Sequence, residues 1–493
     1  MSQLLSWEGL LALLLGGLYG SLFGAIPGLT ATLAVALFVP IAFFLDPAIA
    51  LPAIIAISSV AIYAGDVGSA VARIPGTPAS AAYADELYAL SQRNGPIFGL
   101  GLSAMASSVG GILGTLFLMG SATGIAAIAT RFSSFEYFWI AVLGLTAGIF
   151  ASGGSPLKSM VSLFLGILFA TVGVDPTLGY GRFHFGIPDL MGGLHYIVAM
   201  IGLFGFSEVL EFLYMGDQEK VSAPNVQGNA SRAFFFQPLV RMRKKVGMIL
   251  RSSTIGVFVG FLPGAGADIG AWVSSSIQKV QGKATPNAST QEEDIILAGT
   301  SSNNAAVASA WIPALSLGLP GDTVTAIVLG IFMMKGITPG PLLFEQQLPL
   351  IWTLFGTFLL ANILLLPLYG FLTARLAAYL VRIPKNLLMS VIAVICLVGA
   401  FTINHSVVDI WIMMGMGLTA FFLKRGGFPL AQVVLGMVLG RILEQNFMVS
   451  AIKSKWDISS FFERPIALVL MSLTLLIIVM GLRVRKKHLR VEP

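Results

Sequence analysis

Charged residues are scarce in this chain. Of its 493 residues, 11% are charged and 56% are hydrophobic, whereas soluble domains carry about 25% charged residues. A soluble fold would leave too much apolar surface in water, so the bilayer is expected to replace water as the solvent. Because isolated apolar segments satisfy their backbone groups in lipid only as helices, we expect an all-α, polytopic integral membrane protein.

The chain also lacks the residues that several kinds of chemistry need. The single cysteine, Cys396, excludes an intrachain disulfide and a cysteine-based metal cluster. The histidines do not have the spacing of metal ligands, and no GxxxxGKS or GxxxxGKT sequence is present for ATP. Ser and Asp are scattered without a histidine partner, so no catalytic residues are assigned and we expect no enzyme.

Long apolar runs are what the chain has instead. A run of roughly 17 to 25 residues can cross the bilayer, and on that criterion we expect about eleven or twelve transmembrane helices. The clearest runs are 97–130, 135–151, 156–173, 194–214, 350–374, 387–403, 407–423 and 466–482.

Basic residues predict the orientation of these spans, because cytoplasmic loops retain Lys and Arg. The tail 483–490 and the polar stretch 216–245 are both rich in them, so we expect both to be cytoplasmic. The N-terminus has few charges and lacks the basic stretch and cleavage site of a signal peptide. We expect it to form the first span and to begin outside.

The sequence repeats itself. Segments 20–28 and 256–264 share three glycines and a proline at an offset of 236, and Pro75-Gly76 matches Pro320-Gly321 at an offset of 245. The pattern predicts two inverted-topology repeats, as in many secondary transporters. We expect a first membrane repeat over 1–215, a cytoplasmic linker over 216–250 and a second repeat over 251–493, with broken helices or re-entrant hairpins.

The repeated Pro-Gly pairs are the candidate binding site. Proline and glycine break a helix, and broken backbone within a membrane must be buried in protein or line a wet cavity. The alternative is a kink whose small residues allow close helix packing. The predicted substrate-binding residues in these breaks and beside them are Pro27, Gly28, Leu29, Thr30, Arg73, Pro75, Gly76, Thr77, Ser80, Pro263, Gly264, Asn303, Asn304, Pro320 and Gly321.

Four segments carry a resemblance to a known family. They are GAIPGLTATLAVALFVP at 24–40, RIPGTPASAA at 73–82, NNAAVASAWIPALSLGLPGD at 303–322 and GITPGPLLF at 336–344. Together they resemble the large membrane subunit of the tripartite tricarboxylate transporters, over most of the chain. The resemblance implies import of small carboxylates across the cell inner membrane by symport with Na+ or H+. It also implies two partners, a small membrane subunit and a periplasmic solute-binding protein.

Some charges depart from that family's pattern. Asp66, Arg73, Asp268 and Asp322 stand where small or neutral residues are usual, and Thr300 stands where an acid is typical. Charges within the membrane are costly, so each needs a partner or a wet cavity. Two interpretations of Arg73 stay open: an ion pair with Asp66, seven residues away, or an anchor for a substrate carboxylate. The three aspartates are candidate ion- or proton-coupling residues.

The leading hypothesis is therefore a secondary carboxylate transporter supplied by a binding protein. One alternative is an ion-coupled carboxylate transporter that works without a binding protein. A channel is a weaker alternative, because broken helices in inverted repeats favour alternating access. We also expect the Pro-Gly pairs at 75–76 and 320–321 to meet near the midplane and to line one polar cavity.

Overall fold

The computed structural model describes residues 6–26, 29–151, 155–216, 230–264, 266–281, 288–380 and 383–488. Helices dominate this part of the chain, and the two described strands form a short antiparallel hairpin in which Gly173 lies opposite Arg182. The first half consists of α1 (Trp7–Ala25), α2 (Ala31–Phe44), α3 (Pro47–Ala64), α4 (Asp66–Ala72), η1 (Ser80–Ala82), α5 (Ala84–Asn94), α6 (Pro96–Ala129), α7 (Ser134–Ala151), α8 (Pro156–Ala170), β1 (Gly173–Val174), β2 (Gly181–Arg182), η2 (Pro188–Gly192), α9 (Tyr196–Met200), η3 (Ile201–Phe206) and α10 (Ser207–Met215).

The second half begins with a short helical segment that precedes the next long helix. Its elements are η4 (Arg232–Phe236), α11 (Gln237–Arg243), α12 (Val246–Phe261), α13 (Ala267–Gln281), α14 (Ala288–Ser309), α15 (Trp311–Leu317), α16 (Thr323–Met334), α17 (Pro341–Gln346), α18 (Leu348–Leu360), η6 (Ala361–Leu365), α19 (Leu366–Leu380), α20 (Lys385–Asn404), α21 (Val407–Arg425), α22 (Leu430–Lys453), η7 (Ile458–Phe461) and α23 (Pro465–His488).

Many of these helices are candidates for membrane crossing. Among the described residues, nine are long and apolar enough: Trp7–Ala25, Pro47–Ala72, Pro96–Ala129, Tyr196–Met215, Leu348–Ala377, Lys385–Asn404, Val407–Arg425, Leu430–Lys453 and Pro465–Arg483. Five shorter apolar helices accompany them: Ala31–Phe44, Ser134–Phe150, Pro156–Ala170, Val246–Phe261 and Thr323–Met334. The all-α, polytopic class predicted from the sequence is confirmed. The predicted number of spans exceeds nine because it includes runs such as 135–151 and 156–173, which fold as the shorter helices.

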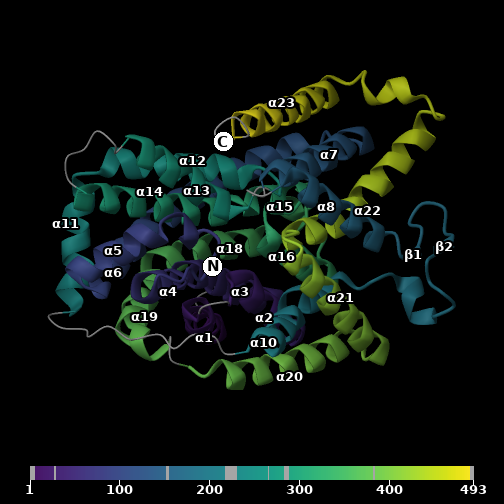
Figure 1. Cartoon of the computed structure of the whole chain (residues 1–493). Coiled ribbons are helices and arrows are strands. Elements are labelled where there is room, and N and C mark those ends of the chain that lie inside the picture. The colour runs from purple at the N-terminus through teal and green to yellow at the C-terminus, as the bar shows by residue number, and fades with distance from the viewer. Residues whose placement is uncertain are drawn as a thin grey trace.

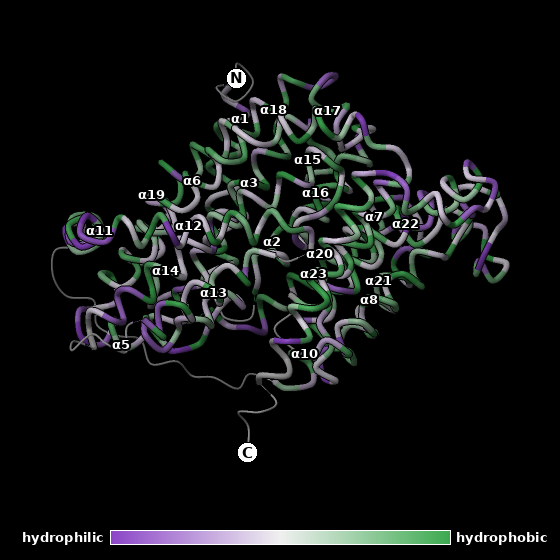
Figure 2. The backbone as a smooth tube through the Cα atoms, turned by 90° about the horizontal axis from the view of Figure 1, so that it is seen from above, coloured by the Kyte–Doolittle hydropathy of each residue, from purple (hydrophilic) through white to green (hydrophobic). Residues whose placement is uncertain are grey.

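Polar segments gather at the edges of the helical body. The helices α5 and α11 lie at one end of the molecule and the β1–β2 hairpin projects at the other, with apolar helices between them (Figures 1 and 2). Ion pairs tie the polar end with α5 and α11 together, among them Arg93 with Glu292 at 2.7 Å and Lys279 with Glu86 at 2.9 Å. The apolar body thus has the surface that lipid would cover.

Glycines set the packing of the innermost helices. The glycines of α1 lie against the backbone of α3, and those of α12 lie against α14 in the same way. A Cβ added at Gly24 would lie 2.3 Å from the Ala61 carbonyl oxygen, and one added at Gly260 would lie 2.3 Å from that of Ala306. Only glycine permits such close helix crossings. The close-packing role considered for the repeated glycines is therefore real, and the Pro-Gly pairs follow at the helix ends.

Element boundaries recur at the two offsets found in the sequence. A shift of 236 residues takes Ala31, the start of α2, to Ala267, the start of α13. A shift of 245 residues takes α4 (Asp66–Ala72) onto α15 (Trp311–Leu317). Each of these short helices ends at a residue in the left-handed region, Arg73 with φ 62° and Gly318 with φ 70°. The two halves therefore fold their matched segments alike.

Candidate functional site

The Pro-Gly segments of the second half touch directly. The backbone N–H of Gly264 donates to the carbonyl oxygens of Pro320 at 3.3 Å and Gly321 at 3.0 Å, and Gly266 donates to Gly321 at 3.3 Å. These bonds occupy backbone groups released where α12 ends at Phe261 and before α13 begins at Ala267. The break after α12 and the loop before α16 thus form one unit.

The first half has a related arrangement. Gly76 donates its N–H to the Gly65 carbonyl at 3.0 Å, and a Cβ added at Gly76 would lie 3.1 Å from the carbonyl oxygen of Gly24, at the end of α1. In the second half, a Cβ at Gly321 would lie 2.4 Å from the carbonyl oxygen of Ala310, the residue that a shift of 245 makes equivalent to Gly65. Both Pro-Gly loops therefore pack against the point where two consecutive helices meet.

Two predicted residues of the first break, Pro27 and Gly28, lie outside the described residues. The next two are placed: Leu29 is fully buried, and Thr30 is the N-cap of α2, where its hydroxyl accepts from the Leu33 N–H at 3.2 Å. Thr77 and Ser80 bond to each other through side chain and backbone, with the Ser80 hydroxyl donating to the Thr77 carbonyl at 2.8 Å. This closed turn follows the exposed Pro75 and the buried Gly76.

The two halves meet through exchanged contacts. The hydroxyls of Thr32, near the start of α2, and Thr323, at the start of α16, are 2.8 Å apart. At the equivalent position of the second half, the carboxylate of Asp268 near the start of α13 lies close to the backbone N–H of Ala79. A shift of 236 takes Thr32 to Asp268, while Ala79 and Thr323 both lie in the segments that follow the second Pro-Gly pair. Reciprocal contacts of this kind are what a two-fold relation produces.

A small buried cluster lies at the contact between the two halves, which is called the junction below. It consists of three pairs that the two offsets make equivalent: Ala31 with Ala267, Ala61 with Ala306, and Ile62 with Val307. Since Ala31 and Ala267 are the first residues of α2 and α13, the N-termini of these two helices converge there. Their partly positive ends favour an anionic group.

The predicted coupling residue Asp66 is 1% exposed. Its carboxylate accepts hydrogen bonds from the hydroxyls of Tyr83, at 2.9 Å, and Ser103. Tyr83 and Ser103 lie 17 and 37 residues further along the chain. Sequence reasoning missed both, since nothing local links them to Asp66. Asp66 is thus a deeply buried carboxylate held by neutral donors.

The other two aspartates sit at helix starts. Asp322 is the N-cap of α16: its carboxylate accepts from the Thr325 N–H at 2.7 Å, and its own N–H donates to the Thr325 hydroxyl at 2.8 Å. This reciprocal capping box gives Asp322 a structural role that the sequence analysis did not consider. Asp268 and Asp322 lie near enough for their charges to repel.

Arg73 faces away from Asp66. Its guanidinium donates to the carboxylate of Asp85 in α5 at 2.6 Å, and the two side chains are 62% and 68% exposed. The guanidinium lowers the pKa of Asp85 through this hydrogen bond. The pairing of Arg73 with Asp66 that sequence spacing suggested is therefore not found. The cause is the left-handed turn at Arg73, which ends the helix before the two side chains can share a face.

Asn303 and Asn304 lie in different environments. Asn304 donates through its side-chain amide to the Ser107 carbonyl at 3.1 Å and to the side chain of Asn362 at 2.8 Å, which joins α14 to α6 and η6. Asn303 is 2% exposed, and its side-chain oxygen has no hydrogen-bond partner among the described residues. Thr300 bonds to the Ile296 carbonyl of its own helix at 2.8 Å. Asn304 thus has a structural partner, while Asn303 keeps an acceptor available for a ligand.

No group of three or more His, Cys, Asp or Glu that could hold a metal ion is found in the described part of the chain. The functional groups assembled at the junction are instead backbone amides, hydroxyls and single carboxylates. Thr32 and Thr323 belong to this set and were missed from the sequence. The signal that could have found Thr32 is its equivalence to Asp268 at the offset of 236.

Comparison with known proteins places this arrangement in a family. The chain is 31% identical over 471 residues to an uncharacterized 52.8 kDa protein in the TAR-I ttuC' 3' region of Agrobacterium vitis, covering 95% of this chain and 92% of that protein. It is 32% identical over 231 residues to an uncharacterized protein in the TAR-II ttuC' 3' region of the same organism, covering 46% of this chain and 93% of that protein.

No solved structure matches the chain. The profile of the tripartite tricarboxylate transporter TctA family matches residues 10–435, which include both Pro-Gly repeats and the three candidate coupling residues Asp66, Asp268 and Asp322. The chain belongs to the tripartite tricarboxylate transporter TctA family, as a multi-pass membrane component of a tricarboxylate transporter.

Proposed function

We propose that this chain imports small di- or tricarboxylates as the large subunit of a secondary active transporter, by symport with Na+ or H+. A periplasmic solute-binding protein delivers the substrate, and a small membrane subunit completes the assembly. The observation that carries the proposal is the exchange of contacts at the Pro-Gly breaks, Thr32 with Thr323 and Asp268 with Ala79. Substrate and ion sites of secondary transporters lie at such breaks between two repeats.

The packing of two equivalent helices supports an inverted relation of the halves. A shift of 245 takes Pro96, which begins α6, to Pro341, which begins the α17–α19 stretch. Along the contact between them, Ala104 of α6 lies beside Gly370, and Gly111 further on lies beside Asn362. The order of the contacts is opposite in the two helices, so they run antiparallel. Equivalent antiparallel helices are what an axis within the membrane plane produces.

The chemistry at the junction suits a carboxylate and a cation. Backbone N–H groups at the converging starts of α2 and α13 would bind substrate oxygens, with Thr30, the N-cap of α2, as a neutral partner. Thr77 and Asn303 are further neutral candidates, and the side-chain oxygen of Asn303 has no hydrogen-bond partner among the described residues. Asp66, Asp268 and Asp322 would hold the coupling ion or proton, because a carboxylate at this depth is retained only with a compensating partner. Arg73 remains a prediction as a carboxylate anchor, since its guanidinium is exposed and pairs with Asp85.

The orientation of the chain in the cell inner membrane is part of the proposal. Arg241, Lys245 and Lys279 all lie at the end of the molecule formed by α5 and α11, where they pair with acidic residues. Positive charge favours the cytoplasmic side. We therefore place this end and the C-terminus in the cytoplasm, and the β1–β2 hairpin on the periplasmic side, where a binding protein would dock.

Uptake into proteoliposomes tests the proposal. The chain, with its small membrane subunit, is reconstituted and supplied with labelled di- and tricarboxylates, with or without imposed Na+ and H+ gradients and with or without the binding protein. We expect uptake above the equilibrium level only when one gradient is imposed, and stimulation by the binding protein. Fast equilibration that no gradient drives would instead indicate a channel. Gradient-driven uptake that the binding protein does not alter would indicate a transporter that works alone.

A further inference from the structure

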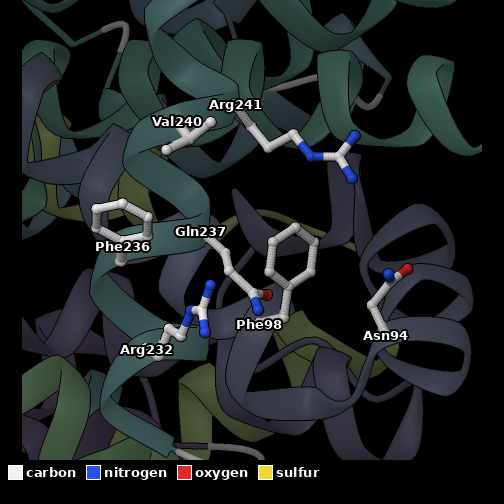
Figure 3. A pocket seen from close by; sticks show the side chains of 7 residues that line it. All are labelled: Asn94, Phe98, Arg232, Phe236, Gln237, Val240 and Arg241. Carbon is white, nitrogen blue, oxygen red and sulfur yellow. The ribbon is translucent and has the colours of Figure 1, made fainter.

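A surface cavity of about 180 Å³ lies away from the Pro-Gly junction, where η4 and α11 cross the ends of α5 and α6. Its lining residues are Asn94, Phe98, Arg232, Phe236, Gln237, Val240 and Arg241 (Figure 3). Phe98 is buried and forms the floor, while the other six residues are exposed. The cavity therefore opens at the surface and combines two arginines, two amides and two aromatic rings.

The helical segment that forms one wall is firmly seated. Phe234, Pro238 and Met242, spaced four residues apart, are buried and form its inner face. Phe234 passes close to Gly101 of α6, where an added Cβ would lie 2.4 Å from the Phe234 carbonyl oxygen, and its ring lies 5.4 Å from that of Phe371 in α19. This packing fixes the orientation of the other faces of the segment. Arg232, Gln237 and Arg241 are thereby held toward the cavity.

The outer face of the same segment is apolar and exposed. Phe236, Leu239 and Val240 are 60%, 47% and 44% exposed. Apolar exposure continues onto the adjoining membrane helices, with Leu250 of α12 and Leu376 of α19 among the exposed side chains. The cavity is thus bordered on one side by surface that lipid would cover, and on the other by the polar end of the molecule.

The direction of α11 fits this boundary. It runs across the direction of α12 and α14 in Figure 1 and is seen end-on in Figure 2. A short helix that lies across membrane helices, with basic residues beside an exposed apolar stripe, has the character of an interfacial helix. Arg241, Arg243 and Lys244 stand directly before α12, a candidate juxtamembrane position.

We propose that this cavity binds the headgroup of an anionic phospholipid. Arg232 and Arg241 would bind the phosphate oxygens, since a guanidinium offers paired donors that match a phosphate. Gln237 and Asn94 would bond to the glycerol and headgroup hydroxyls, and Phe236 and Val240 would contact the acyl chains. The cavity of about 180 Å³ has room for such a group, since a water molecule occupies about 30 Å³.

The charges around the cavity are compatible with this role. The guanidinium of Arg241 also lies 3.4 Å from the carboxylate of Glu293. Glu293 has a second cation, Lys245, at 3.6 Å. Glu293 therefore stays paired when Arg241 turns toward a phosphate. The exposed apolar stripe distinguishes a lipid from a free anion. A small hydrophilic anion leaves Phe236, Leu239 and Val240 in water or detergent, whereas acyl chains bury them.

The test uses the purified full chain in detergent. Its thermal unfolding is followed with added short-chain phosphatidylglycerol, short-chain phosphatidylcholine or inorganic phosphate. We expect phosphatidylglycerol to raise the unfolding temperature of the wild type and of Arg243→Gln, a basic neighbour on the same segment that does not line the cavity. The Arg232→Gln/Arg241→Gln double variant should need at least about tenfold more phosphatidylglycerol for the same shift, since about 1.4 kcal/mol corresponds to a factor of ten.

Charge-retaining variants keep the test decisive if the double Gln variant does not fold. Arg232→Lys/Arg241→Lys keeps both charges but loses the paired donors, so its response to phosphatidylglycerol should be weaker than that of Arg243→Gln. Equal stabilisation of the wild type and the Lys or Gln double variant would overturn the site. Equal stabilisation by phosphatidylcholine would show that the cavity does not distinguish an anionic headgroup, and would overturn the proposal. A full shift with inorganic phosphate alone would overturn the lipid in favour of a free anion.

Discussion

Asp66 and Asp322 illustrate how differently two carboxylates can be held in the same protein. Asp66 is buried and accepts from the hydroxyls of Tyr83 and Ser103, without an ion pair among the described residues. Asp322 caps α16 through its reciprocal bonds with Thr325. A buried charge without a cation is costly, whereas a carboxylate at a helix N-terminus is stabilising by itself. The two positions therefore call for different experiments.

Changing Asp66→Asn should remove the coupling of uptake to the ion gradient. The amide has nearly the shape of the carboxylate but carries no negative charge, so it cannot take up a proton near neutral pH and holds Na+ more weakly. We expect at least about a tenfold loss of gradient-driven uptake, equivalent to about 1.4 kcal/mol, with an unfolding temperature equal to or above that of the wild type. Tyr83→Phe is the control, because it removes one donor and keeps the carboxylate. Gradient-driven uptake at the wild-type rate in Asp66→Asn would exclude the coupling role.

Asp322 can be tested by separating its cap from its charge. Asparagine is as good an N-cap as aspartate, whereas alanine costs about 1 kcal/mol. Asp322→Asn should therefore unfold close to the wild-type temperature and Asp322→Ala at a lower one. If Asp322 also serves coupling, Asp322→Asn should lose or change the ion dependence of uptake. Normal ion dependence in Asp322→Asn, together with a destabilised Asp322→Ala, would reduce the residue to a helix cap.

Residue partners were the hardest feature to predict from the sequence. The unusual charges Asp66, Asp268 and Asp322 could be identified, because aspartate stands out in apolar runs. Their surroundings could not, since Tyr83 and Ser103 reach Asp66 only through the packing of α5 and α6 on α4. The left-handed turn at Arg73 likewise depends on the tertiary fold, because arginine itself has no preference for it.

At the scale of elements, the breaks depend on close backbone contact. A Cβ at Gly321 would lie 2.4 Å from the carbonyl oxygen of Ala310, and one at Gly76 would lie 2.8 Å from Gly65. Neither distance can be relieved by rotating a side chain, because both neighbours are backbone atoms. The loops can approach the helix junctions only because both positions are glycine.

Gly321→Ala should therefore displace the loop from α15 and reduce uptake strongly. The chain should still insert and remain helical, because the long spans do not depend on this contact. Gly124→Ala is the matched control: it lies in α6, where an added Cβ would meet nothing within 4 Å, and alanine favours the helix by about 1 kcal/mol. Circular dichroism and uptake are measured on both variants. Wild-type uptake in Gly321→Ala would show that the loop tolerates movement and that the break has no special role.

The sequence identified elements well where they are uniformly apolar. The runs 387–403 and 407–423 fall within α20 and α21. Among the nine candidate spans of the described residues, α22 has the lowest mean hydropathy, 1.3 against 2.4 for α20, since Gln432, Arg441 and Glu444 dilute its apolar residues. Arg182 and Glu444 form an ion pair that links the β hairpin to α22, so part of this polarity is used in packing.

At the scale of the whole molecule, the repeat connects sequence to mechanism. The offsets of 236 and 245 could be read from two Pro-Gly pairs, and element boundaries follow them. How the halves dock could not be read, because contacts such as Thr32 with Thr323 join residues 291 positions apart. The proposed alternating access would require these docked segments to rearrange during each cycle. The junction should therefore be both the site of binding and a moving part.

A reversible cross-link across this junction tests whether the two halves must move there during transport. The Thr32 and Thr323 hydroxyl oxygens are 2.8 Å apart, so cysteines at these positions can form a disulfide. The background variant is Cys396→Ala, which removes the single native cysteine. The control pair is Asp189→Cys with Ser406→Cys, whose side-chain oxygens are 3.5 Å apart beside the hairpin.

The measurement is gradient-driven carboxylate uptake before oxidation, after oxidation and after reduction, with the extent of cross-linking determined on the same samples. We expect oxidation of the Thr32→Cys/Thr323→Cys variant to abolish uptake and reduction to restore it, while the oxidised control pair still transports. Complete cross-linking between positions 32 and 323 with unchanged uptake would contradict movement at this junction, because the two halves would then transport without separating there.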